Sequence, residues 1–268
     1  AAARLVGVVN KYCAVNVLFQ KSSGIMLPDE KLLALLSGKP VVEDADEHYN
    51  HTFFELSMAI RFAERLGAGA KIDLSSNCDV VVLDDELAIE CKYLHSARKI
   101  RGEFSDAMSQ LDERLQSKQA KLGAVAFDLS NLVDKDKIQK FAVETFELFA
   151  RAYEKLINSR SVFASDIGVN GVLKSVINDG NFARIVQSFI AHEAEIVFFS
   201  NFTKGEVKKL TTEKVAVLFQ QNNYLCFEYE DELTPVPARS LSYYINGALP
   251  ISTYDGVTAL IKSLCVGN

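Results

Sequence analysis

Residues 78–92 read CDVVVLDDELAIECK, and their pattern is the most informative about the fold. Its first part, from Asp79 to Leu83, is almost pure valine and predicts a buried strand. Its last part, from Leu87 to Leu94, predicts a strand that returns beside the first. Because successive side chains of a strand point to opposite faces, Glu90 and Lys92 are expected to point the same way. The stretch therefore predicts a strand pair that presents an acidic and a basic group on one face.

The turn expected at Asp84-Asp85 folds the two strands together and brings Asp79 near Glu90 or Lys92. Two neighbouring carboxylates repel each other, and a magnesium ion, which prefers oxygen ligands, removes that cost. A lysine beside them can hold an attacking water and stabilise charge on a phosphoryl oxygen. The pattern of Asp, Glu and Lys therefore fits metal-assisted hydrolysis of a phosphodiester bond.

A regular order of elements surrounds this strand pair. The expected helix over residues 48–66 carries Glu55 on its apolar face, where a carboxylate requires an explanation. A long helix between the third and fourth strands implies a crossover connection, and so a mixed sheet. The expected elements are a helix over 48–66, strands over 71–74, 79–83 and 87–94, a helix over 97–121, a strand over 124–129 and a helix over 136–157.

Asp79, followed on the next strand by Glu90-Cys91-Lys92, resembles the signature of the PD-(D/E)xK nuclease superfamily. The order of elements around it is also similar to that family's core, over residues 47–130. One departure is that Cys78, not proline, precedes the aspartate. The resemblance implies an α/β fold with a restriction-endonuclease-like core, in which helices flank a central mixed sheet.

The resemblance also implies roles for individual residues. Lys92 would position the attacking water, and Gln110, on the helix after the lysine, would steady the site or a phosphate. The metal would be Mg²⁺ or Mn²⁺. Its implied ligands are Asp79, Glu90, the backbone carbonyl of Cys91, and Glu55 for a second metal or through water.

The basic residues Arg98, Lys99 and Arg101 follow the signature at the start of the next helix. They are candidates for contacts to the phosphate backbone of a nucleic acid, with DNA as the expected substrate. They can equally be solvated surface charges, because the acidic Glu103 and Asp106 lie among them.

Other interpretations of the same residues stay open. Glu90 and Lys92 can form a plain ion pair on a solvated edge strand. The chain can be a catalytically inactive member of the same fold that binds nucleic acid or a partner protein. A third hypothesis is a sugar hydrolase with Glu55 and Glu90 as its acid–base pair, against which the lysine in the site argues.

Composition narrows the class of protein. The chain has 268 residues, of which 49% are hydrophobic and 24% are charged, as in an ordinary globular protein. A net charge of −6 argues against a binder that relies on a broad basic face. No apolar run is long enough to cross a membrane. Five scattered cysteines without a CxxC pair predict reduced thiols and a cytoplasmic location.

Three regions are expected along the chain. Residues 1–46 form an N-terminal extension packed on the core, 47–160 form the nuclease-like core, and 161–268 form an additional C-terminal α+β region, which can belong to the same domain. This last region is a candidate surface for a homodimer or a partner protein. In the N-terminal extension we expect a strand over 13–19 and a helix from Pro28 to Gly38. In the C-terminal region we expect a helix over 169–190 broken near 178–180, strands over 195–201, 214–219 and 224–229, and a helix over 256–264.

Overall fold

The structure is a computed structural model, and each statement below concerns the residues that it describes. The signature stretch is described except for its turn, so the prediction for Asp84-Asp85 lies outside the described residues, as do Gly38 and His48. The described residues are 8–9, 12–13, 15–19, 24–37, 49–67, 69–76, 78–82, 86–159, 164–207, 210–211 and 213–265.

Within these residues, seven strands form one mixed sheet whose spatial order follows the sequence. The two pairs β2–β3 and β3–β4 are antiparallel, β4, β5 and β6 run parallel to one another, and β7 returns antiparallel along β6. The strands are β1 (Ile25–Met26), β2 (Ile72–Asp73), β3 (Val80–Val82), β4 (Leu87–Tyr93), β5 (Leu122–Asp128), β6 (Lys214–Tyr229) and β7 (Glu232–Ile245).

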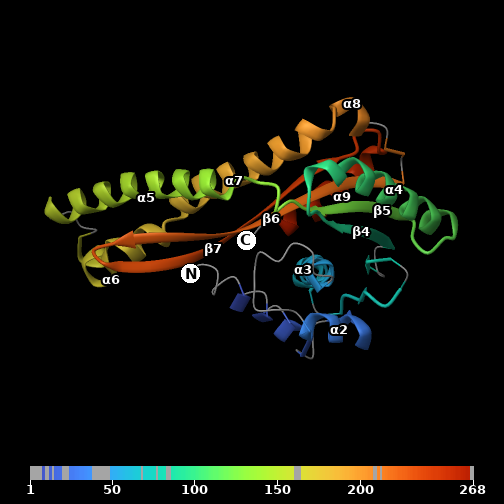
Figure 1. Ribbon diagram of the computed structural model, residues 1–268, viewed down its shortest axis with the longest axis horizontal. Coiled ribbons are helices and arrows are strands. Elements are labelled where there is room, and N and C mark those ends of the chain that lie inside the picture. The colour runs from blue at the N-terminus through green and yellow to red at the C-terminus, as the bar shows by residue number, and fades with distance from the viewer. Residues whose placement is uncertain are drawn as a thin grey trace.

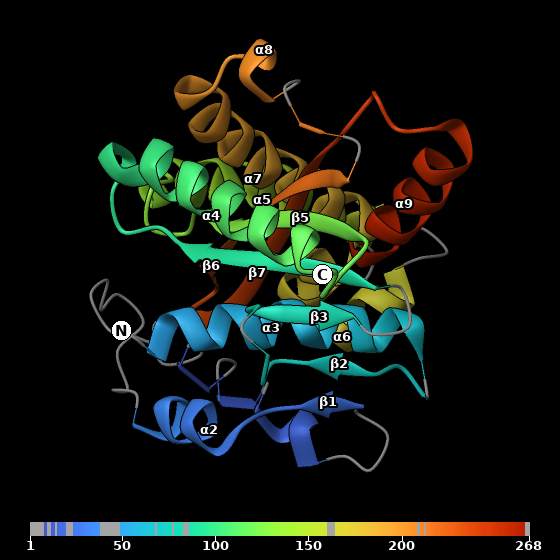
Figure 2. The ribbon, with the colours of Figure 1, turned by 90° about the vertical axis from the view of Figure 1, so that its right-hand side faces the viewer.

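Helices cover both faces of the sheet, with α3 below and α4 above β4 and β5 in Figure 1; Figure 2 gives the same layers from the side. They are α2 (Asp29–Leu36), α3 (Tyr49–Leu66), α4 (Ile100–Gln116), α5 (Lys135–Asn158), α6 (Ala164–Ile177), α7 (Gly180–Asn201), α8 (Lys204–Val207) and α9 (Ile251–Leu264), with single 3₁₀ turns η1 (Asn16–Phe19) and η2 (Ala97–Lys99).

The central strand β4 is buried on both faces, and its side chains alternate between two cores. Ile89 and Cys91 pack in the core under α3 and α9. Ala88 packs in the core under α4 and α7, and Glu90 and Lys92 share its face. The predicted alternation is therefore confirmed, and it turns Glu90 and Lys92 toward α4.

The strands β6 and β7 continue beyond the core sheet as a long two-stranded ribbon. Helices α5, α6 and α7 pack along this ribbon and form an arm on the left of Figure 1. The arm has a core of its own, which includes Phe146, Phe182 and Phe227. Because β6 pairs with β5, the ribbon joins the expected C-terminal region to the sheet of the expected nuclease-like core.

The strand β7 is absent from the sequence-based expectation, and its prolines explain why. Pro235 and Pro237 have no N–H to donate, and proline in a strand is tolerated at an edge, where β7 lies. The hairpin also turns at Glu230 and Asp231, both with positive φ, without the usual glycine or asparagine. The sequence therefore lacks two common signals of a hairpin, a second strand without proline and a turn with glycine or asparagine.

Two further predictions are wrong. The predicted strand over 13–19 is helical where it is described, and Val15 and Leu18, three residues apart, pack together against α3. The predicted strand over 195–201 is the last part of α7, because Ala194, Phe198 and Phe202 recur at helical spacing against the core under α4. In each case packing of one face outweighs the β-propensity of the residues.

Other differences concern boundaries. The helix predicted over 97–121 ends at Gln116, and Lys118 turns away with a positive φ. The strands predicted over 214–219 and 224–229 are one strand, and the last helix begins at Ile251, after Pro250, instead of at Gly256. The break near 178–180 is confirmed, since Asp179 caps α7.

The α/β class and the mixed sheet flanked by helices are confirmed. The predicted succession of helix, three strands, helix and strand is present as α3, β2, β3, β4, α4 and β5. No described helix combines the length and the apolar character that a membrane crossing needs. All five cysteines are free thiols.

Candidate functional site

Asp79 immediately precedes β3, and its carboxylate lies against the backbone of β4. Its Oδ2 accepts a hydrogen bond of 2.7 Å from the backbone N–H of Cys91. The side chain of Cys91 points to the opposite face, into the core under α3. Asp79 is partly exposed, whereas its neighbours Cys78 and Val80 are buried. Asp79 is therefore fixed against the middle of β4 at the partly exposed edge of the candidate site.

Glu90 is almost completely buried, with 2% of its surface exposed. Burial, followed by repulsion from Asp79 and hydrogen bonding to it, raises the pKa of Glu90 to about 7. Its Oε1 has no hydrogen-bond partner, although the guanidinium of Arg114 is 3.9 Å away. Glu90 is thus a buried acid that lacks full compensation for its charge.

Lys92 lies two residues further along β4 and is held by helix α4. Its Nζ donates a hydrogen bond of 2.7 Å to Gln110 Oε1. Gln110 and Arg114 are four residues apart on α4, so they lie on one face of the helix, above Lys92 and Glu90. Helix α4 therefore positions Glu90 and Lys92, the two charged side chains of β4.

Glu55 reaches the same cluster from α3. Its Oε2 forms an ion pair of 2.6 Å with Lys31 Nζ on α2. Burial and then the charge of Asp79 raise the pKa of Glu55 to about 7, although Lys31 and Lys92 oppose this shift. Because Asp79 affects the pKa of both glutamates, the three carboxyls lie within electrostatic reach of one another.

The structure thus brings together four of the five residues predicted for the site, Asp79, Glu90, Lys92 and Gln110, and places Glu55 within electrostatic reach of Asp79 and Lys92. Among the described residues, however, no three His, Cys, Asp or Glu side chains are arranged to hold a metal ion. The donor set still fits magnesium, which is commonly held by one or two carboxylates together with water and substrate oxygens. The unsatisfied Oε1 of Glu90 is the group that a cation beside Asp79 would satisfy.

The three predicted phosphate-contacting residues lie on the surface at η2 and the start of α4. Arg98 and Lys99 are exposed. Arg101 is exposed as well, but its guanidinium forms a 2.9 Å ion pair with Glu206 on α8 and lies 5.8 Å from the ring centre of Phe202. Arg98 and Lys99 are therefore better placed than Arg101 to meet a phosphate.

Three features of this region were not predicted from the sequence. Lys31 belongs to α2, far from the signature, and no local pattern points to it. Arg114 could have been found, because it follows Gln110 by one helical turn. His51 and His95, whose Nε2 atoms are 3.3 Å apart, form a pair beside the ring of Tyr93.

Comparison with protein-family models, curated proteins and solved structures finds no match to this chain. The functional argument therefore rests on the chemistry of the site.

Proposed function

We propose that this protein is a metal-dependent nuclease that hydrolyses phosphodiester bonds of nucleic acid, with DNA as the expected substrate. The observation that carries the proposal is the pairing of Asp79 with the buried Glu90, beside Lys92 on the same strand face. Phosphodiester hydrolysis of this kind requires oxygen ligands for a metal ion and a positively charged group beside them. The two adjacent carboxyls match the first requirement, and the ammonium group of the lysine matches the second. The resemblance to the PD-(D/E)xK superfamily supports the same assignment.

The residues of the site have separate tasks. Asp79 and Glu90 would hold Mg²⁺ or Mn²⁺, with the Cys91 carbonyl and Glu55 as further ligands. A bound metal ion would polarise the phosphoryl group and acidify water. Lys92 uses one of its three N–H groups on Gln110, so two remain for a water molecule or a phosphoryl oxygen. Gln110 thereby fixes the direction of the Lys92 ammonium group.

An inactive module of the same fold, which binds nucleic acid or a partner protein, is the second candidate. The absence of a three-residue metal cluster from the described residues favours it. The buried Glu90 argues against it, because a buried acid with an unsatisfied oxygen beside a second carboxylate costs stability and has no role in a module that only binds.

Cleavage assays on linear, supercoiled and single-stranded DNA and on RNA, with Mg²⁺, separate the two candidates. We expect the wild type to cut at least one substrate, EDTA to stop cleavage, and Lys92→Ala or Glu90→Ala to reduce the rate by about 100-fold or more. Lys140→Ala is the matched control, since this lysine is exposed on α5 in the arm. Full activity in EDTA, or equal activity of Lys92→Ala and wild type, would contradict the proposal.

A further inference from the structure

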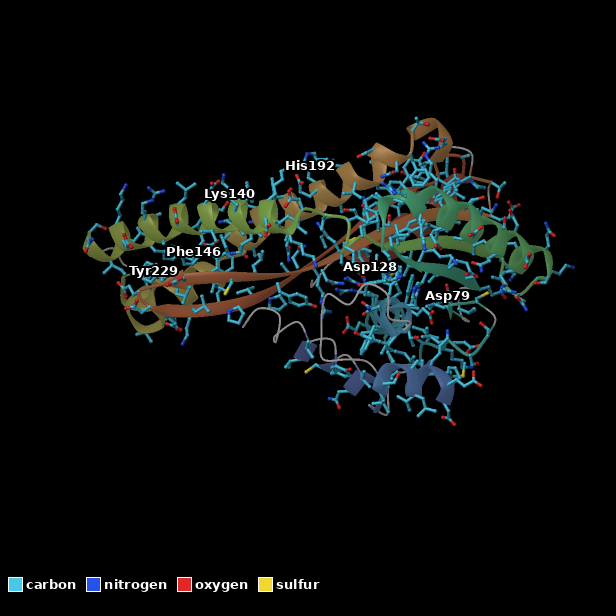
Figure 3. The ribbon with its side chains drawn as sticks, in the orientation of Figure 1. Asp79, Asp128, Lys140, Phe146, His192 and Tyr229 are labelled. Atoms are coloured by element: carbon cyan, nitrogen blue, oxygen red, sulfur yellow. The ribbon has the colours of Figure 1, made fainter. Side chains whose placement is uncertain are left out.

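A polar pocket lies on the other side of β4 from Glu90 and Lys92, under the face of α3 that carries Asn50 and Ser57. It opens at the carboxyl ends of the parallel strands β4 and β5, at Tyr93 and Asp128, beside Gln220 of β6, which continues past both ends. Open α/β sheets bind their ligands at this edge. Figure 3 shows Asp79 and Asp128 at separate places along the sheet, so the two sites are neighbours and not one site.

Asp128 organises the floor of this pocket and is 3% exposed. Its Oδ1 accepts a 2.8 Å hydrogen bond from the backbone N–H of Ser130. Its Oδ2 accepts bonds from Gln220 Nε2 at 2.9 Å and from Asn222 Nδ2 at 3.3 Å. Both carboxylate oxygens are therefore occupied by protein donors. Asp128 acts as a positioning residue that holds two amide side chains of β6 in place.

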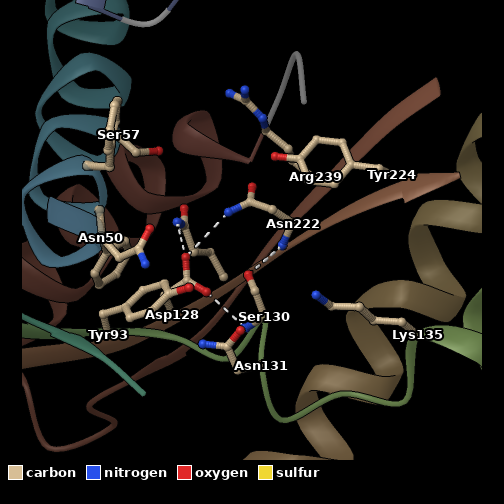
Figure 4. Close-up of a pocket in the computed structure, with 13 residues that line it drawn as sticks. Asn50, Ser57, Tyr93, Asp128, Ser130, Asn131, Lys135, Asn222, Tyr224 and Arg239 are labelled. Carbon is tan, nitrogen blue, oxygen red and sulfur yellow. Dashed lines mark hydrogen bonds between the residues drawn. The ribbon is translucent and has the colours of Figure 1, made fainter. Parts of the chain in front are cut away.

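The amide of Gln220 is incompletely satisfied. Gln220 is only 1% exposed and lines the pocket, yet its Oε1 accepts no hydrogen bond. A buried acceptor without a partner costs free energy that a ligand donor would recover. Figure 4 shows Asn50, Asp128 and Asn222 pointing toward a common space, so donors and acceptors of several amides face the same ligand position.

The walls and the mouth add two further kinds of group. Tyr93 and Tyr224, with Phe53 and Phe54 from α3, supply aromatic rings. Lys135 and Arg239 are the cations of the lining, and with Asp128 they leave an excess of one positive charge in a chain whose net charge is −6. Arg239 is opposite Asn222 in the β6–β7 ladder, so a fixed backbone register sets its place.

We propose that this pocket binds a nucleotide, with its base among the amide side chains and the tyrosine rings and its phosphate at Arg239 and Lys135. Unpaired bases are recognised by hydrogen bonds to their edges and by stacking on aromatic side chains. Arginine and lysine recognise the phosphate. The pocket holds a cavity of about 80 Å³, room for several waters, which suits one nucleotide whether it is free or an unpaired unit of a longer strand.

Other ligand classes fit less well. A metal ion would need free carboxylate oxygens, and both oxygens of Asp128, which is the pocket's acidic residue, are hydrogen-bonded within the protein. A neutral sugar would leave Lys135 and Arg239 without a role. The nucleotide proposal stands whether or not Asp79 and Glu90 support cleavage, because the pocket shares none of the residues predicted for the nuclease site.

Binding is tested on the full chain carrying Lys92→Ala, in EDTA, so that cleavage cannot affect the result. Isothermal titration compares nucleoside monophosphates, the same nucleosides without phosphate, inorganic phosphate and glucose. A second arm uses a short single-stranded oligonucleotide and the same sequence as a duplex. Preference for the free monophosphates identifies a mononucleotide ligand, and preference for the single strand identifies an unpaired nucleotide of a longer strand.

We expect Arg239→Met and Asn222→Leu each to weaken binding by about 10-fold or more, as for the loss of a hydrogen bond to a charged or buried group. The matched control Arg151→Met, on the exposed face of α5, should bind like its parent. Circular dichroism checks that each variant folds. If Asn222→Leu does not fold, Arg239→Met, at a partly exposed position, tests nucleotide binding by itself. The proposal is overturned if no nucleotide or strand binds, if phosphate or glucose binds equally well, or if Arg239→Met leaves affinity unchanged.

Discussion

Glu90 and Glu55 are acids in places that favour their protonated form. Each has a pKa of about 7, raised first by burial and then by Asp79. Between the unfolded-state value near 4.5 and this raised value, the folded chain binds more protons than the unfolded chain. Proton binding by these two glutamates therefore stabilises the folded chain at pH 4.5, and this stabilisation is lost as the pH rises through 7.

We therefore predict that the free energy of unfolding of the metal-free protein falls between pH 5 and pH 8, by roughly 1–3 kcal/mol from these groups. Urea denaturation in EDTA at a series of pH values measures the slope. Glu90→Gln removes one titrating group, so its slope should be flatter than that of the wild type. Identical slopes for the two proteins would show that Glu90 does not titrate in this range.

Gly24 illustrates how a single residue sets a close approach in the described N-terminal region. Its φ is +61°, and a Cβ built on it would lie 1.8 Å from the carbonyl oxygen of Ala70, part of the backbone beside β2. The same glycine accepts a hydrogen bond from the N–H of Ile72.

Gly24→Ala should therefore destabilise the protein by more than 1 kcal/mol, since both the backbone conformation and the space exclude a side chain. Gly102→Ala is the matched control, because a Cβ there meets nothing within 4 Å and lies in helix α4. Thermal unfolding of both variants tests this, and equal melting temperatures would contradict the argument.

At the scale of elements, α7 depends on the side chain that begins it. Asp179 Oδ1 accepts hydrogen bonds from the N–H groups of Asn181 and Phe182, and its Oδ2 accepts one from the hydroxyl of Tyr153 on α5. The hydrogen bond from Tyr153 is the largest cause of the lowered pKa of Asp179. One carboxylate thus caps α7 and ties it to α5.

Asp179→Ala should lower the free energy of unfolding by about 1 kcal/mol, and Asp179→Asn by less, since asparagine also caps helices. Glu195→Ala, in the middle of the same helix and exposed, should change it little. Urea denaturation of the three variants measures the differences. A loss for Glu195→Ala equal to that for Asp179→Ala would mean that capping is not the cause.

The elements that could be predicted are those whose pattern is local. The alternation in β4 placed Glu90 and Lys92 correctly, and helical spacing placed Glu55 and Gln110. The partner of Glu55 could not be predicted, because Lys31 meets it only through the packing of α2 on α3. For the same reason β7 was missed: its pairing with β6 permits the prolines that a sequence pattern treats as breaks.

At the scale of the molecule, the arm has its own apolar core. The ring of Phe146 on α5 contacts the rings of Phe182 on α7 and of Phe227 and Tyr229 on β6. Phe146 is 2% exposed. This residue therefore joins two helices of the arm to the ribbon.

Phe146→Ala should cost about 3–5 kcal/mol of local stability, the range for a large buried ring. Hydrogen exchange should accelerate in α5, α6 and α7, while β4 and β5 keep their protection because their contacts lie in other cores. The exposed Leu148 on the same helix provides the control Leu148→Ala. Equal acceleration in β4 and in the arm would show that the two parts unfold together.

The ribbon β6–β7 has one more consequence for the molecule. Gln220, Asn222 and Tyr224 lie on it where it leaves the core sheet for the arm, and alternation turns all three to one side. Paired strands of this kind twist more readily than a broad sheet does. Because the amides that donate to Asp128 lie on this ribbon, a change in its twist would change the geometry of the pocket floor.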